Sequence, residues 1–172
     1  METNGPGRIY LLGSAGSGKG VVGEALAKAL GARFVAPNAS SEAFVRDPSR
    51  AERELLRYST QVLAPPTEGA LLEVVELPPS ALLEPAVRSL LAEARERGDI
   101  AVLLDAPPDV LLRRAGLTAS QMGYLGTPRA WFRLLHSELL ESYKGMFDCE
   151  ADTTNLDPSR VGEEVIAACG LN

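Results

Sequence analysis

The glycine-rich stretch GSAGSGKG, at residues 13–20, has the spacing of a phosphate-binding loop. Glycines at this spacing let backbone amides approach an anion closely, because they adopt conformations that a side chain disfavours. Lys19 adds a positive charge that can reach the outer phosphates of a nucleotide. We therefore predict that ATP binds through the loop residues Gly13, Ser14, Ala15, Gly16, Ser17, Gly18, Lys19 and Gly20.

The last residue of this motif departs from the usual pattern. A P-loop places Ser or Thr directly after its lysine, and that hydroxyl normally holds Mg²⁺. Gly20 offers no such ligand. Mg²⁺ could still be carried by nucleotide phosphates, water and a carboxylate from elsewhere, since it usually keeps several waters. The sequence therefore predicts ATP as a cofactor, whereas Mg²⁺ stays an open possibility without an assigned protein ligand.

Short apolar runs alternate with helical patterns along the chain, which is typical of βαβ units on a parallel sheet. RIYLL at residues 8–12 predicts a strand that runs directly into the glycine loop, and residues 19–30 predict the helix that follows. This is the context that a phosphate-binding loop requires. Further extended segments are expected at residues 33–36, 70–77, 100–104 and 152–155, and further helices at 49–63, 82–97, 109–115, 129–144 and 158–168.

Composition bounds the class of protein. The 172 residues suffice for one domain, 1–172, with its own core, and 45% apolar and 23% charged residues are ordinary globular values. A net charge of −6 argues against nucleic acid or an anionic membrane as a partner. No apolar run approaches the ~20 residues of a membrane span. A small-molecule substrate is the expected partner, and the oligomeric state is not indicated.

The cysteines and the histidine point away from a zinc site. Cys149 and Cys169 are the two cysteines and show no C-x-x-C spacing, and His136 is the single histidine. We expect both cysteines to be free thiols in a reducing compartment, which predicts a cytoplasmic location.

A lid is predicted at residues 116–128, which hold three glycines and few core residues. Arg113 and Arg114 precede this segment, and Arg129 and Arg133 follow it. Arginines beside a lid can clamp ATP or a phosphoryl group in transfer, although each taken singly is more often a surface charge. Of these four arginines, we select Arg113 as the first candidate for a clamp on ATP or on the phosphoryl group.

Acidic residues at strand ends are candidates for orienting an acceptor hydroxyl, because ligands of an open parallel sheet bind beyond the carboxyl ends of its strands. Glu76 lies nearest such an end, whereas Glu73 lies farther from it. Glu76 is therefore the better candidate acid, although a single glutamate at a strand end is more often a solvated or paired carboxylate. Asp105 closes the fourth strand and could simply form a turn.

Aromatic residues gather around the lid and the helix after it: Tyr124, Trp131, Phe132 and His136. They could line a substrate pocket, or they could be the ordinary packing of an amphipathic helix.

Three stretches together resemble the shikimate kinases: residues 8–35, 74–114 and 147–169. The first contains the glycine loop, the second follows the family's order of strand, helix, strand and helix, and the third is similar to its closing segment. The resemblance covers nearly the whole chain. It implies an α/β fold, a P-loop three-layer sandwich in which a five-stranded parallel sheet is flanked by helices, with a lid over the active site. Within the segment LLRR, Arg113 resembles a nucleotide-contacting arginine of related kinases.

The family's substrate motifs are not matched. Ala-Pro-Asn at residues 36–38 stands where the family has an Asp-x-Asp pair that serves Mg²⁺ and the substrate hydroxyl. Leu-Pro-Pro at 77–79 replaces its glycine triplet. Tyr124 lies near the position of the lid arginine and Tyr143 near that of a substrate-carboxylate arginine, while Arg57 matches another substrate arginine only loosely. The resemblance therefore predicts a substrate other than shikimate.

The leading interpretation is an ATP-dependent phosphotransferase acting on a hydroxyl of a small metabolite, with Lys19, Glu76 and Arg113 as its catalytic residues. Two alternatives stay open. One is a nucleotide-binding or repurposed protein of the kinase fold without kinase activity, because several required groups are missing. The other is a nucleoside or nucleotide kinase, whose lid and strand order look alike at the level of sequence.

Overall fold

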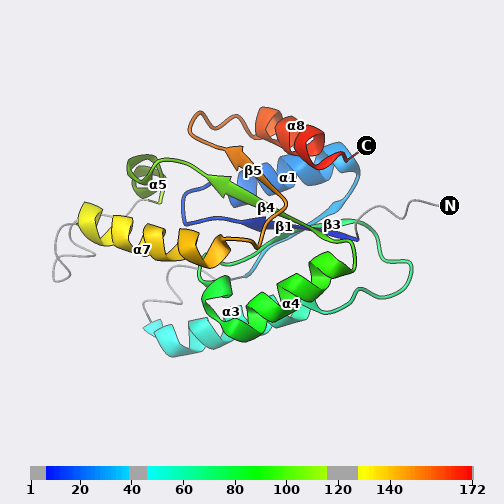
Figure 1. Ribbon diagram of the computed structural model, residues 1–172, viewed down its shortest axis with the longest axis horizontal. Coiled ribbons are helices and arrows are strands. Elements are labelled where there is room, and N and C mark those ends of the chain that lie inside the picture. Colours follow the sequence, from blue (N-terminus) through cyan, green and yellow to red (C-terminus); the bar gives the residue numbers. More distant parts are fainter. Residues whose placement is uncertain (1–6, 39–45, 116–127, 172) are drawn as a thin grey trace.

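The computed structural model describes residues 7–38, 46–115 and 128–171. Within these ranges the chain forms a five-stranded parallel sheet with the strand order β2-β3-β1-β4-β5. Helices cover both faces of the sheet (Figure 1). The predicted fold class is confirmed. The predicted lid lies outside the described residues, apart from Pro128 at the start of a helix.

The central strand leads into the glycine loop. β1 (Arg8–Leu12) lies between β3 (Glu73–Glu76) and β4 (Ile100–Asp105). A strand that is covered on both faces must be almost continuously apolar, and Ile9 through Leu12 are buried. The outer strands are β2 (Arg33–Val35), next to β3, and β5 (Cys149–Asp152), next to β4.

Two helical layers enclose the sheet. α1 (Lys19–Leu30) and α8 (Pro158–Cys169) cover one face, and α3 (Pro48–Leu63) and α4 (Pro85–Glu96) cover the other (Figure 1). α5 (Pro108–Arg114) and α7 (Pro128–Tyr143) pack together on the side to which the strands point.

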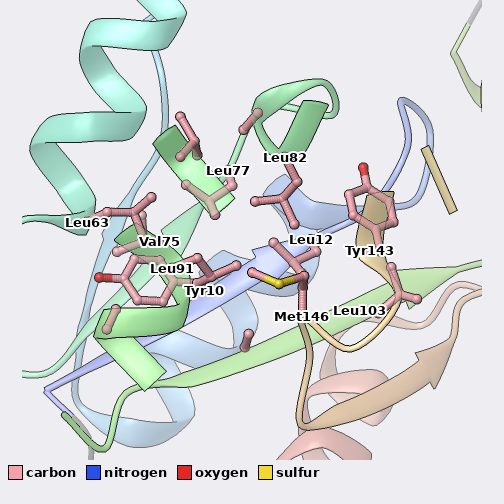
Figure 2. Close-up of a cluster of buried hydrophobic side chains, with 14 of the residues drawn as sticks. Tyr10, Leu12, Leu63, Val75, Leu77, Leu82, Leu91, Leu103, Tyr143 and Met146 are labelled. Atoms are coloured by element: carbon pink, nitrogen blue, oxygen red, sulfur yellow. The ribbon is translucent and has the colours of Figure 1, made fainter. Parts of the chain in front are cut away.

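Alternating strand residues supply two separate cores. Ile9 and Leu11 face α1 and α8, whereas Tyr10 and Leu12 face α3 and α4. Figure 2 shows the second core, in which Leu63, Leu91 and other aliphatic side chains surround Tyr10 and Leu12. Because side chains alternate between the faces of a strand, the same alternation along β3 places Glu76 on the face that α1 and α8 cover.

Three predicted elements differ from the structure. The helix expected at 82–97 is divided into a 3₁₀ turn (Ala81–Leu83) and α4, because Pro85 lacks an amide hydrogen and is accommodated only at a helix start. The extended segment expected at 70–77 is shorter in the structure: β3 begins only at Glu73, opposite the first residue of β1. The extended piece expected at 152–155 is also shifted. β5 ends at Asp152, whose carboxylate accepts a hydrogen bond from the Thr154 amide at 2.8 Å.

The expectation of free thiols is wrong. Cys149 and Cys169 form a disulfide, with their Cα atoms 6.3 Å apart. Cys149 begins β5 and Cys169 ends α8, and the helix runs back along the strand that precedes it. This reversal brings together two residues that are 20 positions apart in the sequence.

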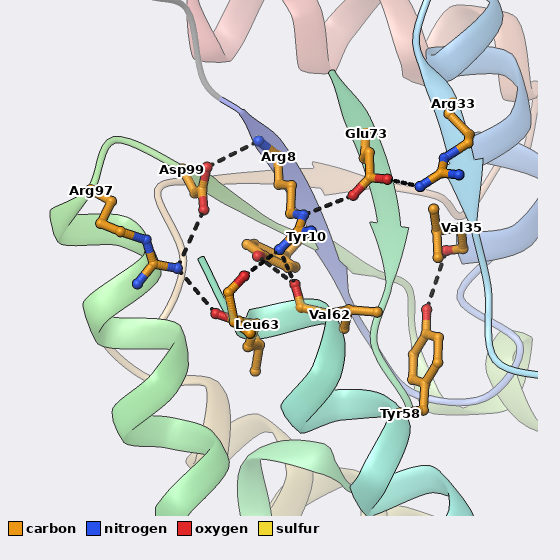
Figure 3. Close-up of polar contacts among 11 residues, drawn as sticks. Arg8, Tyr10, Arg33, Val35, Tyr58, Val62, Leu63, Glu73, Arg97 and Asp99 are labelled. Atoms are coloured by element: carbon orange, nitrogen blue, oxygen red, sulfur yellow. Dashed lines mark hydrogen bonds and ion pairs between the residues drawn. The ribbon is translucent and has the colours of Figure 1, made fainter. Parts of the chain in front are cut away.

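A polar network closes the amino-terminal edge of the sheet (Figure 3). Arg8 Nε donates to Glu73 Oε2 at 2.8 Å, Arg33 also pairs with Glu73, and the Arg8 amide donates to Asp99 at 3.0 Å. Burial alone would raise the pKa of Glu73, but the hydrogen bonds from Arg33 and Arg8 outweigh it and lower the pKa. Glu73 is thus engaged in ion pairs at the edge opposite the glycine loop.

Candidate functional site

The glycine loop connects β1 to α1 at the carboxyl edge of the sheet. Gly16 has φ 80°, and a Cβ atom on it would lie 2.4 Å from the carbonyl oxygen of Leu111, so the loop can pass this point only as glycine. Gly18, with φ 91°, caps α1 without a side-chain hydrogen bond, and no acidic residue occupies the first turn. The amides of that turn can therefore receive an anion.

Lys19 lies at the start of α1 and is only 5% exposed. Its Nζ donates to the carbonyl oxygens of Gly13, at 2.7 Å, and Ser14, at 3.2 Å. Burial lowers the pKa of Lys19 to about 8, against a smaller opposing effect of the Glu76 carboxylate. The ammonium group is therefore held within the glycine loop.

Glu76, the last residue of β3, faces the amino end of α1. A Cβ atom on Gly20 would lie 3.8 Å from Glu76 Oε2, which is ordinary van der Waals contact. Burial raises the pKa of Glu76, while the charge of Lys19 opposes that shift. The structure thus places this carboxylate beside the position at which the motif lacks its hydroxyl.

Tyr58 of α3 holds the end of β3 in place. Its hydroxyl donates to the carbonyl oxygen of Glu76 at 2.8 Å and lies 3.3 Å from that of Val35, the second contact being visible in Figure 3. Residues 35 and 76 end two neighbouring strands, so a single side chain joins α3 to both.

A chain of buried and half-buried polar side chains links the glycine loop to α7. Ser14 Oγ lies 2.8 Å from His136 Nδ1, and His136 Nε2 lies 3.5 Å from Asp105 Oδ1. Burial raises the pKa of Asp105; the Ala106 amide and His136 act against this shift, and Asp152 adds to it. Sequence reasoning missed this group, since Ser14 and His136 are 122 residues apart.

The aromatic cluster expected around the lid is only partly described. Phe132 and His136 are buried, with parallel rings whose centroids lie 6.4 Å apart. This favours the packing interpretation for these two residues. Tyr124 and the side chain of Trp131 lie outside the described residues.

The arginines near the lid have different surroundings. Arg113 is exposed at the end of α5. Arg114 Nη2 donates to the carbonyl oxygens of Thr153, at 2.6 Å, and Thr154, at 2.7 Å, while its buried Nη1 has no hydrogen-bond partner among the described residues. Arg133 lies 3.4 Å from Asp109, and the side chain of Arg129 is not described.

Tyr143 and Arg57, which stand near the positions of two substrate arginines of the family, lie in different surroundings. Tyr143 is buried, and its hydroxyl donates to the carbonyl oxygen of Pro79 at 2.7 Å, which joins α7 to the segment after β3. Arg57 is exposed on α3.

A cavity of about 500 Å³ lies between α3 and the segment that follows β3. Pro78, two residues beyond Glu76, is part of its wall, as is Ser59, which follows Tyr58. Part of the cavity wall therefore lies at the same edge of the sheet as the glycine loop. Its size is that of a small-molecule site.

Nucleotide and metal fit this site differently. The glycine cradle, the open first turn of α1 and the buried Lys19 suit the phosphates of ATP. Within the described ranges, no three Asp, Glu, His or Cys side chains converge to hold a metal ion. Glu76 by itself would not complete a Mg²⁺ site, and phosphate oxygens and water would have to supply the remaining ligands. In the same ranges, no helix has both the length and the apolar character needed to cross a membrane.

No family model matches the sequence. The shikimate kinase of Mycobacterium avium (strain 104) is 30% identical over 170 residues, which cover 93% of this chain and 92% of that protein. The shikimate kinase of Thermobifida fusca (strain YX) is 30% identical over 162 residues, which cover 89% of each.

Solved structures share the fold. Shikimate kinase from Acinetobacter baumannii, solved in complex with shikimate, superposes with a TM-score of 0.71 at 19% identity, covering 98% of this chain and 97% of the other. A gluconokinase from Sinorhizobium meliloti 1021 superposes with a TM-score of 0.63 at 24% identity, covering 96% of this chain and 92% of the other. The architecture thus accommodates kinases named for different substrates.

Proposed function

The chain belongs to the shikimate kinase family of ATP-dependent small-metabolite kinases, and we propose that it phosphorylates a hydroxyl group of a small metabolite other than shikimate. One observation carries this proposal. The buried Lys19 ammonium and the Glu76 carboxylate both lie at the amino end of α1, one inside the phosphate cradle and the other beside Gly20. Phosphoryl transfer depends mainly on positioning and on electrostatic stabilisation, and these two groups can supply both.

The glycine loop would hold ATP, which supplies the phosphoryl group for transfer. The amides of residues 13–20 and the Lys19 ammonium would contact its phosphates. Arg114, whose Nη1 is buried without a described partner, lies where α5 meets the loop after β5 and could contact the nucleotide. Arg113 is exposed at the same helix end, and we retain it as a clamp on the phosphates during transfer.

Glu76 would orient the acceptor hydroxyl. It ends β3 at the edge where ligands of a parallel sheet bind, and burial raises its pKa, which favours acceptance of a proton. The same carboxylate could help to hold Mg²⁺ through water, in place of the hydroxyl that Gly20 lacks.

The departures from the family argue against shikimate as the substrate. Tyr143 is committed to a hydrogen bond within the core, and Leu-Pro-Pro at residues 77–79 replaces the glycine triplet. The relatives favour a small-metabolite kinase over the two alternatives, namely a nucleotide-binding protein without kinase activity and a nucleoside or nucleotide kinase. A cytoplasmic location and a single-domain organisation remain predictions.

Calorimetry and an ADP-release assay test the proposal together. We expect ATP to bind to the wild-type chain, and Lys19→Ala to weaken that binding because a charge-assisted contact is lost. A screen of cyclitols, sugars, nucleosides and apolar alcohols should yield an acceptor that releases ADP, while shikimate should not. ATP binding with no turnover on any of these compounds would contradict the kinase assignment, and efficient phosphorylation of shikimate would contradict the substrate claim.

A further inference from the structure

The cavity between α3 and the segment after β3 has an aliphatic patch among its polar lining residues. Leu55 and Leu56 of α3 line one side, and Ala81 and Leu83, which follow β3, line the other. Leu56 is 40% exposed and Leu83 is 47% exposed, so both present apolar surface to the open cavity. Such a patch stabilises an apolar ligand body, because binding removes apolar surface from water on both partners.

Among the described residues, the charged side chains that line this cavity carry a net negative charge. Glu52 and Glu84 contribute two carboxylates, and Arg53 contributes one guanidinium group. A ligand carboxylate placed here would meet a net formal charge of −1, whereas an amine would be attracted. The polar groups therefore disfavour an anionic acceptor.

The cavity also borders the segment that follows Glu76. Pro78 belongs to its wall and lies two residues beyond Glu76, and the hydrogen bond from Tyr58 to Glu76 fixes α3 against this strand end. The cavity and Glu76 thus share one strand end, and a molecule that fills the cavity would have to extend beyond its lining residues to reach the Glu76 carboxylate. Its volume, about 500 Å³, leaves room for a body larger than a single six-membered ring.

We propose that the acceptor is an uncharged or cationic alcohol with an extended apolar body, bound in this cavity. This inference rests on the proposed kinase function. The acceptor oxygen forms a bond to the γ-phosphorus of ATP, and the bond from that phosphorus to the β–γ bridging oxygen breaks. ADP leaves with the electron pair, and the hydroxyl proton passes to Glu76 and then to solvent.

Three matched probes test the acceptor class: biphenyl-4-methanols that carry a methyl, an aminomethyl or a carboxylate group at the 4′ position. By calorimetry in the presence of ADP, we expect the methyl and aminomethyl compounds to bind at least ~10-fold more tightly than the carboxylate, and more tightly than shikimate. In the ADP-release assay with ATP, the same two compounds should be phosphorylated faster. Equal or preferred binding of the carboxylate would overturn the inference.

Leu56→Arg tests the site itself. It adds a cation to the cavity wall, so it should weaken binding of the aminomethyl probe and strengthen that of the carboxylate. Leu71→Arg is the matched control, because Leu71 is 76% exposed and precedes β3 at the other edge of the sheet. The double variant Glu52→Gln/Glu84→Gln, which inserts no bulk, should likewise reduce the preference for the cationic probe. An unchanged preference in both cavity variants would overturn the inference.

The two proposals fail in different ways. If ATP does not bind while the methyl and aminomethyl probes do, the kinase function is wrong and the ligand class of the cavity is retained. If ATP binds and a small anionic polyol is phosphorylated, the kinase function is retained and the inference about the acceptor is wrong.

Discussion

Ser14 Oγ lies 2.8 Å from His136 Nδ1, which joins the glycine loop to the helix that follows the predicted lid. Both side chains are buried, and the other ring nitrogen of His136 faces Asp105 at 3.5 Å. Any movement of α7 must therefore either carry the second residue of the loop with it or break this contact.

His136→Ala should destabilise the protein by about 1–3 kcal/mol, because it leaves the buried Ser14 hydroxyl and the Asp105 carboxylate without this partner. Urea unfolding measures the effect. Leu134→Ala is the control on the same helix, since Leu134 is exposed and its truncation should change the free energy of unfolding by less than about 0.5 kcal/mol. Equal effects of the two substitutions would show that the polar chain contributes no stability.

Lys19→Met should stabilise the nucleotide-free protein at neutral pH while it weakens ATP binding. The folded chain releases the Lys19 proton near pH 8, whereas the unfolded chain holds it to about 10.5, so between these values the unfolded state binds more protons. The stability of the wild type must then rise between pH 8 and about 10.5, and the stability advantage of Lys19→Met must shrink over the same range. Urea unfolding at several pH values from 7 to 10 checks this, and a constant difference would contradict it.

Glu76→Gln should suppress turnover on any acceptor and leave ATP affinity largely intact, because the lost interaction belongs to the transition state. Glu73→Gln is the matched control on the same strand. It breaks ion pairs with Arg8 and Arg33 at the opposite edge, so it should lower stability and spare turnover at a temperature where the variant is folded. Turnover unchanged in Glu76→Gln would remove this residue from the mechanism.

Gly20→Ser should fold and should strengthen the Mg²⁺ dependence of ATP binding. Outside its own helix, the one described atom within 4 Å of a Cβ atom there is Glu76 Oε2, at 3.8 Å. Serine is also about 0.5 kcal/mol better than glycine inside a helix. Gly23→Ser provides a contrast, because its Cβ would lie 2.3 Å from the Phe34 ring and should destabilise the fold. Calorimetry with and without Mg²⁺ tests the first variant. If the wild type already shows strong Mg²⁺ dependence, another group replaces the missing hydroxyl.

Reduction of the disulfide should lower the free energy of unfolding by about 3 kcal/mol, as expected for a closed loop of this length. Urea unfolding with and without dithiothreitol measures this effect. The double variant Cys149→Ala/Cys169→Ala is the control, and its stability should not respond to the reductant.

The sequence by itself determined the elements whose signal is local. The glycine loop, the apolar strand before it and the helix after it follow directly in the chain, and their residues fix backbone conformation without distant partners. Repeated alternation of strands and helices then indicated the parallel sheet. Pro85 marks where this reading failed, because a single missing amide hydrogen outweighed a helical pattern.

Only the tertiary structure decided which distant side chains meet. Strand order places β3 and β4 on either side of β1, so Glu76 approaches Gly20, and Ser14 approaches His136 and Asp105. The return of α8 along β5 pairs the two cysteines, and the separation between α3 and the segment after β3 creates the cavity. Each of these contacts depends on packing among elements far apart in the chain, and local propensity carries no information about that packing.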